Sequence, residues 1–306
     1  MTVVETTWMP RLACPECRAE FGIPADDHIS CSGCRRAFER RAGVWRFLTP
    51  ARGQRLDPFV QQFRAVRERE RRRPSSPEYS QRLPTVAADD PHAGDWSIRR
   101  ESYHHLLRHV LAGGPLPLHV LDVGAGSAWL CHRLAALGHH TVAVDAIDDE
   151  VDGLGAARHY QTPFPIVQAD FDALPFAPGQ FGLIVFNGSL HYATDVAAML
   201  ASAHRLLAPG GAIAVMDSPM FRADRDGAAM VEDTVRRLVV DCGLSEVVIP
   251  GTGYLTFSRL AAIAARLELR PEFVASRGTL RWRLRRQLSR VKLGRAPAAF
   301  GLWVAR

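Results

Sequence analysis

Four cysteines stand near the start of the chain as two Cys-x-x-Cys pairs, Cys14 with Cys17 and Cys31 with Cys34, and thirteen residues separate the pairs. Two such pairs present four thiolates at the tips of two tight turns, which suits the tetrahedral coordination of Zn²⁺. Disulfides are the alternative, but pairs of this kind rarely oxidise in a reducing compartment. Four thiolates leave no open position on the metal. We therefore expect a structural zinc that stabilises a segment of about forty residues with little core of its own.

A glycine-rich turn is the second feature that could do chemistry. The run Val120-Leu-Asp122-Val-Gly124-Ala125-Gly126 lies where a predicted strand enters a predicted helix, which is where a doubly wound fold brings its backbone close to a nucleotide. A dinucleotide site would need a third glycine at the position of Trp129, and Asp122 would repel a pyrophosphate. The same negative charge favours a ligand with an ammonium group and a cationic sulfonium. S-adenosylmethionine is such a ligand.

Polar residues at the ends of the following strands complete the predicted cofactor site. A carboxylate at Asp145, next to Ala146, could accept the protons of both ribose hydroxyl groups. Asp170 could accept the adenine amino group, while the Phe171 ring offers an apolar face. Asn187 and Gly188 follow the fourth strand at the floor of the same crevice. The predicted cofactor residues are Asp122, Gly124, Ala125, Gly126, Asp145, Ala146, Asp170, Phe171, Asn187 and Gly188. A tight turn without a ligand is the alternative.

Alternating strand and helix patterns position these residues. The sequence predicts short buried strands over residues 119–122, 141–145, 165–168, 183–186 and 212–216, separated by segments with helical spacing of apolar residues. This alternation is typical of a parallel sheet with helices on both faces. We predict an α/β, doubly wound fold with a small N-terminal zinc ribbon. The predicted domains are residues 1–49, a linker with a helical segment over 50–97, and a cofactor-binding domain over 98–306.

Residues 98–217 resemble the class I S-adenosylmethionine-dependent methyltransferases, in particular those with a methyltransferase type 11-like domain. The resemblance is carried by the strand-end Leu-Asp-Val-Gly-Ala-Gly loop and by the turn Leu207-Ala-Pro-Gly-Gly211, and Ala128 stands where the family often has glycine. It implies a Rossmann-like, seven-stranded sheet whose last strand is antiparallel, a strand that the terminal segment 300–304 could supply. It also implies methyl transfer from S-adenosylmethionine.

The cysteine-containing segment, Cys14 to Leu48, resembles two kinds of zinc ribbon. One kind partners tRNA and translation-factor methyltransferases, and the other lies at the front of certain ribosomal-RNA guanine methyltransferases. The first implies a protein partner that docks through the ribbon. In the second, one knuckle position is often histidine, whereas this chain has four cysteines.

The methyl acceptor should lie over the strand ends, where His191 is the candidate catalytic base. Its imidazole titrates near neutral pH and could deprotonate a hydroxyl or amine, with Asp195 orienting the ring. The alternative is that His191 caps a helix or packs beneath the cofactor. Transfer to an amine requires only proximity and alignment.

The net charge of +6 is concentrated in one segment, because residues 277–295 hold eight basic residues and no acidic one. A helix there could bind RNA phosphates, an anionic membrane surface or an acidic substrate, or it could be a solvated helix packed on the domain. No apolar run approaches the length that spans a bilayer, so we expect a cytoplasmic protein with no membrane span.

These patterns favour a methyltransferase that uses S-adenosylmethionine and a structural Zn²⁺ and acts on a small-molecule acceptor. An RNA-base methyltransferase, acting on rRNA or tRNA through the ribbon and the basic helix, is the first alternative. A non-catalytic scaffold that retains the fold is the second.

Overall fold

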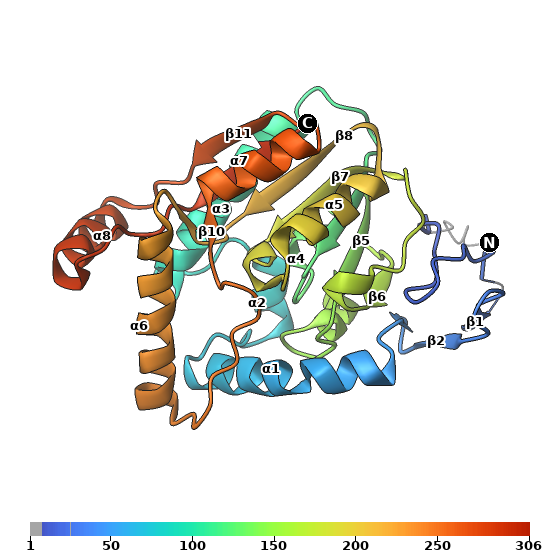
Figure 1. Ribbon diagram of the computed structural model, residues 1–306, viewed down its shortest axis with the longest axis horizontal. Coiled ribbons are helices and arrows are strands. Elements are labelled where there is room, and N and C mark those ends of the chain that lie inside the picture. The colour runs from blue at the N-terminus through green and yellow to red at the C-terminus, as the bar shows by residue number, and fades with distance from the viewer. Residues whose placement is uncertain (1–7, 25) are drawn as a thin grey trace.

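A ten-stranded sheet runs through the molecule, with helices on both of its faces (Figure 1). The structure is a computed structural model that describes residues 8–24 and 26–306, without the side chains at 281, 285, 287 and 289–292. From one edge to the other, the strands are β1 (His28–Ser30), β2 (Ala37–Arg41), β3 (Val44–Arg46), β6 (Ile166–Gln168), β5 (His140–Asp145), β4 (His119–Val123), β7 (Phe181–Asn187), β8 (Leu207–Met216), β12 (Gly301–Ala305) and β11 (Pro271–Ala275).

Seven of these strands, from β6 to β11, form the predicted doubly wound sheet, and the fold class is confirmed. Strands β4 to β8 pair in parallel, and the last strand, β12, is antiparallel to both β8 and β11. β8 begins at Leu207, five residues before the predicted strand, because the Pro-Gly-Gly turn is part of the strand itself. A separate parallel pair is formed by β9 (Met220–Phe221) and β10 (Leu255–Thr256).

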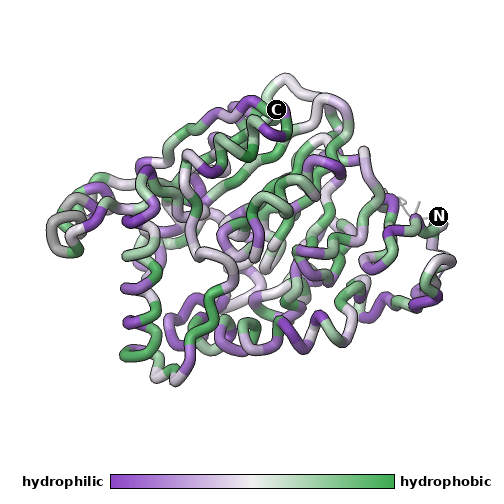
Figure 2. The backbone as a smooth tube through the Cα atoms, in the orientation of Figure 1, coloured by the Kyte–Doolittle hydropathy of each residue, from purple (hydrophilic) through white to green (hydrophobic). Residues whose placement is uncertain are grey.

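The helices cover the sheet in two layers. The α-helices are α1 (Pro50–Arg69), α2 (Pro77–Arg82), α3 (Ala93–Leu106), α4 (Trp129–Ala136), α5 (Val196–Leu206), α6 (Asp224–Cys242), α7 (Phe257–Arg266) and α8 (Leu280–Leu293). Single turns of 3₁₀ or π type are η1 (Leu107–Leu111), η2 (Leu154–His159), η3 (Phe171–Ala173) and η4 (Leu190–Tyr192). Leucines of α3 and α4 pack on one face of the sheet, and apolar residues of α5 and α7 pack on the other. The tube in Figure 2 is accordingly green along much of the sheet.

The cysteine-containing segment is continuous with the main sheet. β3 pairs in parallel with β6, so that β1, β2 and β3 extend the seven-stranded sheet at one edge. Trp45 and Phe47 are almost fully buried and share one apolar cluster with Leu174 and Phe176 of the main domain. The predicted boundary at residue 49 therefore does not separate two cores.

Residues 50–97, for which the sequence predicts a linker with one helix, contain α1, α2 and the beginning of α3. Helix α1 begins with Pro50 at its first turn, where a missing N–H costs nothing, and runs along the lower edge of the molecule in Figure 1. It has no buried residue, so ion pairs and partly buried side chains hold it in place.

The basic helix predicted near the C-terminus is α8, which extends from one end of the molecule (Figure 1). Leu280, Leu284 and Leu288 are exposed on it. The Arg286 guanidinium lies 4.3 Å from the Trp282 ring and donates a hydrogen bond to the Ala298 carbonyl, so it is turned onto the protein. Among the described residues, no helix is long and apolar enough to cross a membrane.

Candidate active site

Loops at the carboxyl ends of β4, β5, β6 and β7 surround a cavity of about 420 Å³. This volume lies in the range of small-molecule sites, and the ends of parallel strands are where ligands of doubly wound sheets bind. The structure brings nine of the ten predicted cofactor residues to its wall: Gly124, Ala125, Gly126, Asp145, Ala146, Asp170, Phe171, Asn187 and Gly188. Asp122 is not among the lining residues.

The glycine turn after β4 is fixed by its own backbone. Gly124 and Ala125 donate hydrogen bonds to the Val144 carbonyl at 2.8 and 3.1 Å, which ties the turn to β5. Gly124 and Gly126 have φ angles of +73° and +54°, in the left-handed region that glycine adopts at low cost. Ala128 is also left-handed, at +57°, a conformation that an alanine adopts at a higher cost than glycine does.

Gly124→Ala is expected to lower the free energy of unfolding by about 2–4 kcal/mol, since it combines a left-handed alanine with overpacking. A Cβ at this position would lie 2.8 Å from Phe171 Cζ and 2.9 Å from Ser189 Oγ, and closer still to Ser189 Cβ. Gly126→Ala is the matched control, because a Cβ there would meet nothing within 4 Å. Urea denaturation of both variants checks this. Equal losses of stability would contradict the packing argument.

Asp145 links the glycine turn to the next loop. Its Oδ2 accepts a hydrogen bond from Gly126 N at 2.8 Å, and its Oδ1 accepts one from Ile147 N at 2.8 Å. Burial raises the pKa of Asp145, and these backbone N–H groups oppose the shift by stabilising the carboxylate. Each oxygen can accept a second hydrogen bond, so the carboxylate can hold the loop and receive two ligand hydroxyl groups.

Asp170 lies in the cavity wall but already has protein partners. Its Oδ2 accepts from Arg52 Nη1 at 3.1 Å and from Arg55 Nη2, both on α1. Its Oδ1 accepts from Asp172 N at 3.3 Å and caps η3. The predicted hydrogen bond to an adenine amino group would therefore compete with the ion pairs. No local pattern in the sequence indicates that α1 contributes to the site.

Asn187, at the end of β7, offers an unsatisfied group to a ligand. Its side chain is 8% exposed, and its Oδ1 atom is buried without a hydrogen-bond partner among the described residues. A buried carbonyl oxygen without a partner is costly, and a donor on a ligand would remove that cost. Gly188 follows with φ +71° and keeps the next residues close to the cavity floor.

Asp122 lies within β4 instead, directed away from the cavity. It is fully buried, its Oδ2 is 3.8 Å from Cys131 Sγ of α4, and its Oδ1 has no partner among the described residues. Burial raises the pKa of Asp122 to about 8, with a smaller contribution from the charge of Asp145. The Asp122 side chain thus lies between β4 and α4. The sequence predicts instead that it contacts the ammonium group of the cofactor.

Asp122→Asn is expected to stabilise the protein at pH 8 and to have little effect near pH 4. Between about pH 4 and pH 8, the unfolded chain loses the proton while the folded chain keeps it, so wild-type stability falls as the pH rises. Asparagine removes this dependence, with an expected gain at pH 8 of at least about 1.4 kcal/mol, the equivalent of one pKa unit. Thermal unfolding at several pH values checks it. Parallel stability profiles of the two proteins would contradict a raised pKa.

His191, the predicted base, lies in η4 and is not among the residues that line the cavity. Its Nδ1 is 3.2 Å from Ser218 Oγ, whereas Asp195 accepts from the N–H groups of Ala197 and Ala198 and caps α5. Burial lowers the pKa of His191 to about 3, assisted by the charge of Arg99. Asp195 therefore does not orient the ring, and the neutral imidazole is a weak base.

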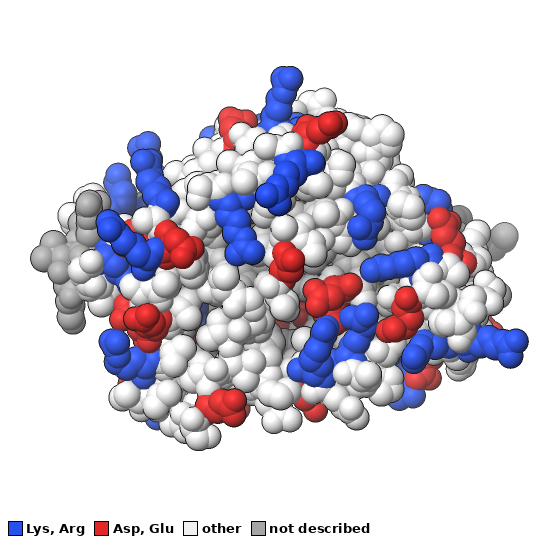
Figure 3. Space-filling view, in the orientation of Figure 1, with Lys and Arg blue, Asp and Glu red and all other residues white. Residues whose placement is uncertain are grey.

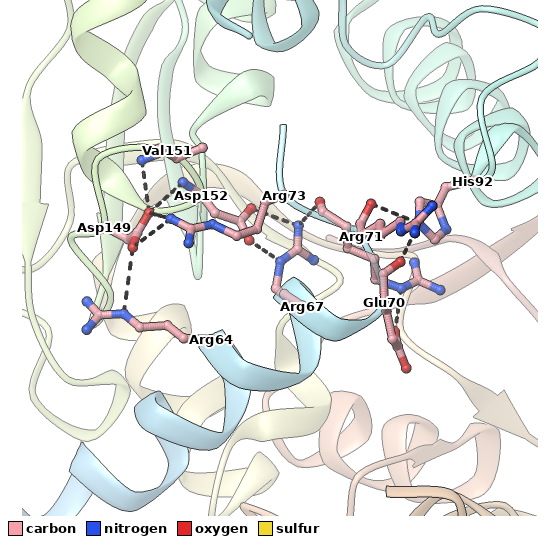
Figure 4. A network of polar contacts seen from close by, with 10 residues as sticks. Arg64, Arg67, Glu70, Arg71, Arg73, His92, Asp149, Val151 and Asp152 are labelled. Atoms are coloured by element: carbon pink, nitrogen blue, oxygen red, sulfur yellow. Dashed lines mark hydrogen bonds and ion pairs between the residues drawn. The ribbon is translucent and has the colours of Figure 1, made fainter. Parts of the chain in front are cut away.

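Helix α1 forms one wall of the cavity and is tied to the loop after β5 by ion pairs (Figure 4). Arg67 Nη2 is 2.7 Å from Asp152 Oδ1, and Arg73 Nη2 is 3.0 Å from Asp149 Oδ1. Asp149 Oδ1 also accepts from the N–H groups of Val151 and Asp152, which rigidifies the loop. These ion pairs therefore hold α1 and the residues that follow it in place against the loop after β5.

The four cysteines form a separate site at the N-terminal edge of the sheet. Their Sγ atoms all lie within 4.8 Å of one another. Tetrahedral zinc with Zn–S bonds of about 2.3 Å would separate the sulfurs by about 3.8 Å, which this cluster can accommodate. Both knuckles have the same backbone turn, in which Arg18 and Arg35 donate to the carbonyls of Cys14 and Cys31 and have φ near +60°. The residues present thus fit a four-thiolate metal site.

Comparison with known proteins agrees with this geometry. Residues 121–215 match the family described as a methyltransferase domain. The malonyl-[acyl-carrier protein] O-methyltransferase of Pseudescherichia vulneris is 33% identical over 125 residues, which are 41% of this chain and 47% of that protein. An uncharacterized methyltransferase of Mycobacterium tuberculosis is 34% identical over 97 residues, 32% of this chain and 49% of that protein.

The chain thus spans about half the length of the curated relatives it matches. Among solved structures, an S-adenosylmethionine-dependent methyltransferase from Mesorhizobium loti is 21% identical, covers 66% of this chain and 97% of its own, and gives a TM-score of 0.47. The matched residues include the carboxyl end of β4 and all of β5, β6 and β7, and the ends of these strands line the cavity. Residues 121–215 therefore match a methyltransferase domain, and they carry the glycine turn and the strand ends around the cavity.

Proposed function

We propose that this protein transfers the methyl group of S-adenosylmethionine to a small-molecule acceptor held in the same cavity. The observation that carries the proposal is the order of groups along the strand ends. The Asp145 carboxylate on β5, the glycine turn on β4 and the unsatisfied Asn187 on β7 lie along one wall. A ribose, a chain with a sulfonium and an amino-acid end follow one another in the cofactor in the same way. Bound there, it would supply an electrophilic methyl group.

The residues around the rest of the cavity support an acceptor with an apolar body. Phe59 and Phe63 of α1 lie 5.4 and 6.4 Å, between ring centroids, from Tyr192, and form an aromatic wall. Leu56, Val60, Val248 and Pro250 add apolar surface. Such a wall excludes water from the transfer step and holds a planar or aliphatic acceptor near the methyl group.

The surface gives less support to an RNA acceptor. Lys and Arg side chains are interspersed with Asp and Glu on the face in Figure 3, without a continuous basic patch there. On the basic helix α8, Arg283 is exposed and Arg286 is packed on Trp282, while the Arg285 side chain lies outside the described residues.

The cysteine cluster is proposed to hold one structural Zn²⁺, which would fix the two knuckles and, through β3, the edge of the sheet. The ribbon is also a proposed docking surface for a protein partner, as its resemblance to the partner ribbons implies. The O-methyltransferase relative in Pseudescherichia vulneris supports oxygen nucleophiles as the first acceptors to assay.

The test is methyl transfer from tritiated S-adenosylmethionine by the zinc-loaded chain. Two acceptor pools are offered, namely metabolites below 3 kDa and RNA of the same cells. Asp145→Asn is the control. Label in the metabolite pool that depends on Asp145 would support the proposal. Label confined to RNA would favour the RNA alternative, and no label together with no cofactor binding would favour the scaffold.

A further inference from the structure

Helix α8, which extends from one end of the molecule, presents a row of leucines to solvent (Figure 1). Leu280, Leu284 and Leu288 are 64%, 58% and 73% exposed, and their four-residue spacing places them on one face of the helix. The sequence has a valine at 291, the next position in the same register. Exposed leucines that occur singly are ordinary, but a row of them on one helix marks an interaction surface.

The opposite face of α8 packs on the domain. Trp282 lies 6.4 Å from Phe300, between ring centroids, and a Cβ at Gly94 of α3 would lie 3.5 Å from the indole ring. One turn further along, Arg286 donates a hydrogen bond to the Ala298 carbonyl. The inward face of the helix is therefore occupied by its own protein, and the leucine row points away from it.

Both ends of α8 are tied to neighbouring helices. Before its start, Glu101 Oε2 of α3 accepts hydrogen bonds from Arg277 N at 2.9 Å and Gly278 N at 2.7 Å. After its end, Arg295 Nε is 2.9 Å from Asp233 Oδ2 of α6. These contacts hold α8 in one orientation, so the leucine row is presented to a partner without a folding step.

Basic positions flank the leucine row on both sides. In the helical register, positions 281, 285 and 292 follow one side of the row and positions 283 and 290 the other, and all five are arginine or lysine. No acidic residue occurs between 277 and 295. A helix that lies in the headgroup layer of a bilayer has this pattern, because its apolar row contacts acyl chains while long basic side chains reach the phosphates beside it.

An anionic bilayer fits this surface better than RNA or a protein partner does. RNA phosphates would bind the basic positions but would leave the leucine row in water. A stable protein interface takes about 800 Å² from each partner and includes hydrogen bonds, whereas the apolar part of this surface is one row on a helix of 14 residues. Anionic lipids match both features, since burial of the row and attraction of the basic positions act together.

We propose that α8 binds the surface of an anionic lipid bilayer, with the leucine row inserted between headgroups and the basic positions on lipid phosphates. The helix would lie in the plane of the interface, which agrees with the absence of a membrane-spanning helix among the described residues. None of the described residues of α8 lines the cavity, so this surface does not depend on the proposed methyl transfer.

The experiment is co-sedimentation of the zinc-loaded chain with vesicles of equal parts phosphatidylglycerol and phosphatidylcholine, and with vesicles of phosphatidylcholine alone. The wild type is expected to sediment with the anionic vesicles and to stay in solution with the neutral ones. Leu284→Gln combined with Leu288→Gln is expected to bind the anionic vesicles at least about tenfold more weakly, because two apolar side chains no longer insert.

Val239→Gln combined with Val240→Gln is the matched control, since both valines are exposed near the end of α6. Its vesicle binding should stay within about threefold of the wild type, and thermal unfolding of both variants should give the wild-type Tm, because only exposed side chains change. Higher salt should weaken vesicle binding of the wild type.

A wild type that stays in solution with the anionic vesicles overturns the proposal, and this outcome needs no variant. Equal binding of the wild type and the leucine variant also overturns it, because charge alone would then explain the attraction. Binding to total RNA in place of vesicles, at the same affinity in the leucine variant, would assign the basic positions to nucleic acid and would likewise overturn it.

Discussion

Asp145→Ala is expected to weaken the binding of S-adenosylhomocysteine about 100-fold or more. The carboxylate would provide two charge-assisted hydrogen bonds to ribose hydroxyl groups, each contributing about 1.5–3 kcal/mol. It also accepts from Gly126 N and Ile147 N, so its removal frees the glycine turn from the loop after β5. Calorimetric titration of the variant measures the loss.

Asp172→Ala is the matched control for this variant. Asp172 also lines the cavity and is also acidic, but its side chain pairs with Arg55 and accepts no hydrogen bond from the glycine turn. We expect its dissociation constant to remain within about threefold of the wild type, since exposed ion pairs contribute little. Equal losses for Asp145→Ala and Asp172→Ala would show that overall charge, and not ribose recognition, decides the affinity.

Cys31→Ser is expected to remove the bound zinc and to lower the free energy of unfolding by about 3 kcal/mol or more, since binding of a structural zinc is coupled to folding. Cys31 is buried, and Phe38 and Trp45 of the ribbon share one apolar cluster with the main domain. Loss of the metal should therefore loosen the β3 edge as well as the knuckles. The expected fall in Tm is about 6 °C or more. Metal analysis and thermal unfolding measure the two effects.

Cys242→Ser is the control for the cysteine variant, because Cys242 ends α6 and lies outside the metal cluster. It should retain one zinc per chain and the Tm of the wild type. Chelation of the wild type should reproduce the Tm of Cys31→Ser. A Cys31→Ser protein with a full complement of zinc would contradict the four-thiolate site.

The parts of the fold that could be predicted from sequence are those with local signals. The strand over residues 119–122 and its glycine turn are observed as β4 and the loop that follows, since buried strands and left-handed turns have residue preferences of their own. The pairing of β3 with β6 joins segments more than a hundred residues apart and has no periodic signal.

The same reason explains what was missed at the site. Arg52 and Arg55 reach Asp170 across more than a hundred residues, and in a chain rich in arginine neither is distinctive. For Asp122, a signal did exist, because alternation along a strand places it on the same face as Val120, which packs with α4. The position of Asp122 just before the glycine turn, taken without this alternation, predicts that Asp122 lies beside the ligand.

The most direct test of the central claim is titration of the full-length, zinc-loaded protein with S-adenosylhomocysteine and S-adenosylmethionine. The geometry of Asp145, the glycine turn and Asn187 predicts binding of one molecule per chain with a dissociation constant in the micromolar range, which corresponds to about −8 kcal/mol. No detectable binding by folded, metal-loaded protein would contradict the proposed methyltransferase activity and leave the scaffold as the better account.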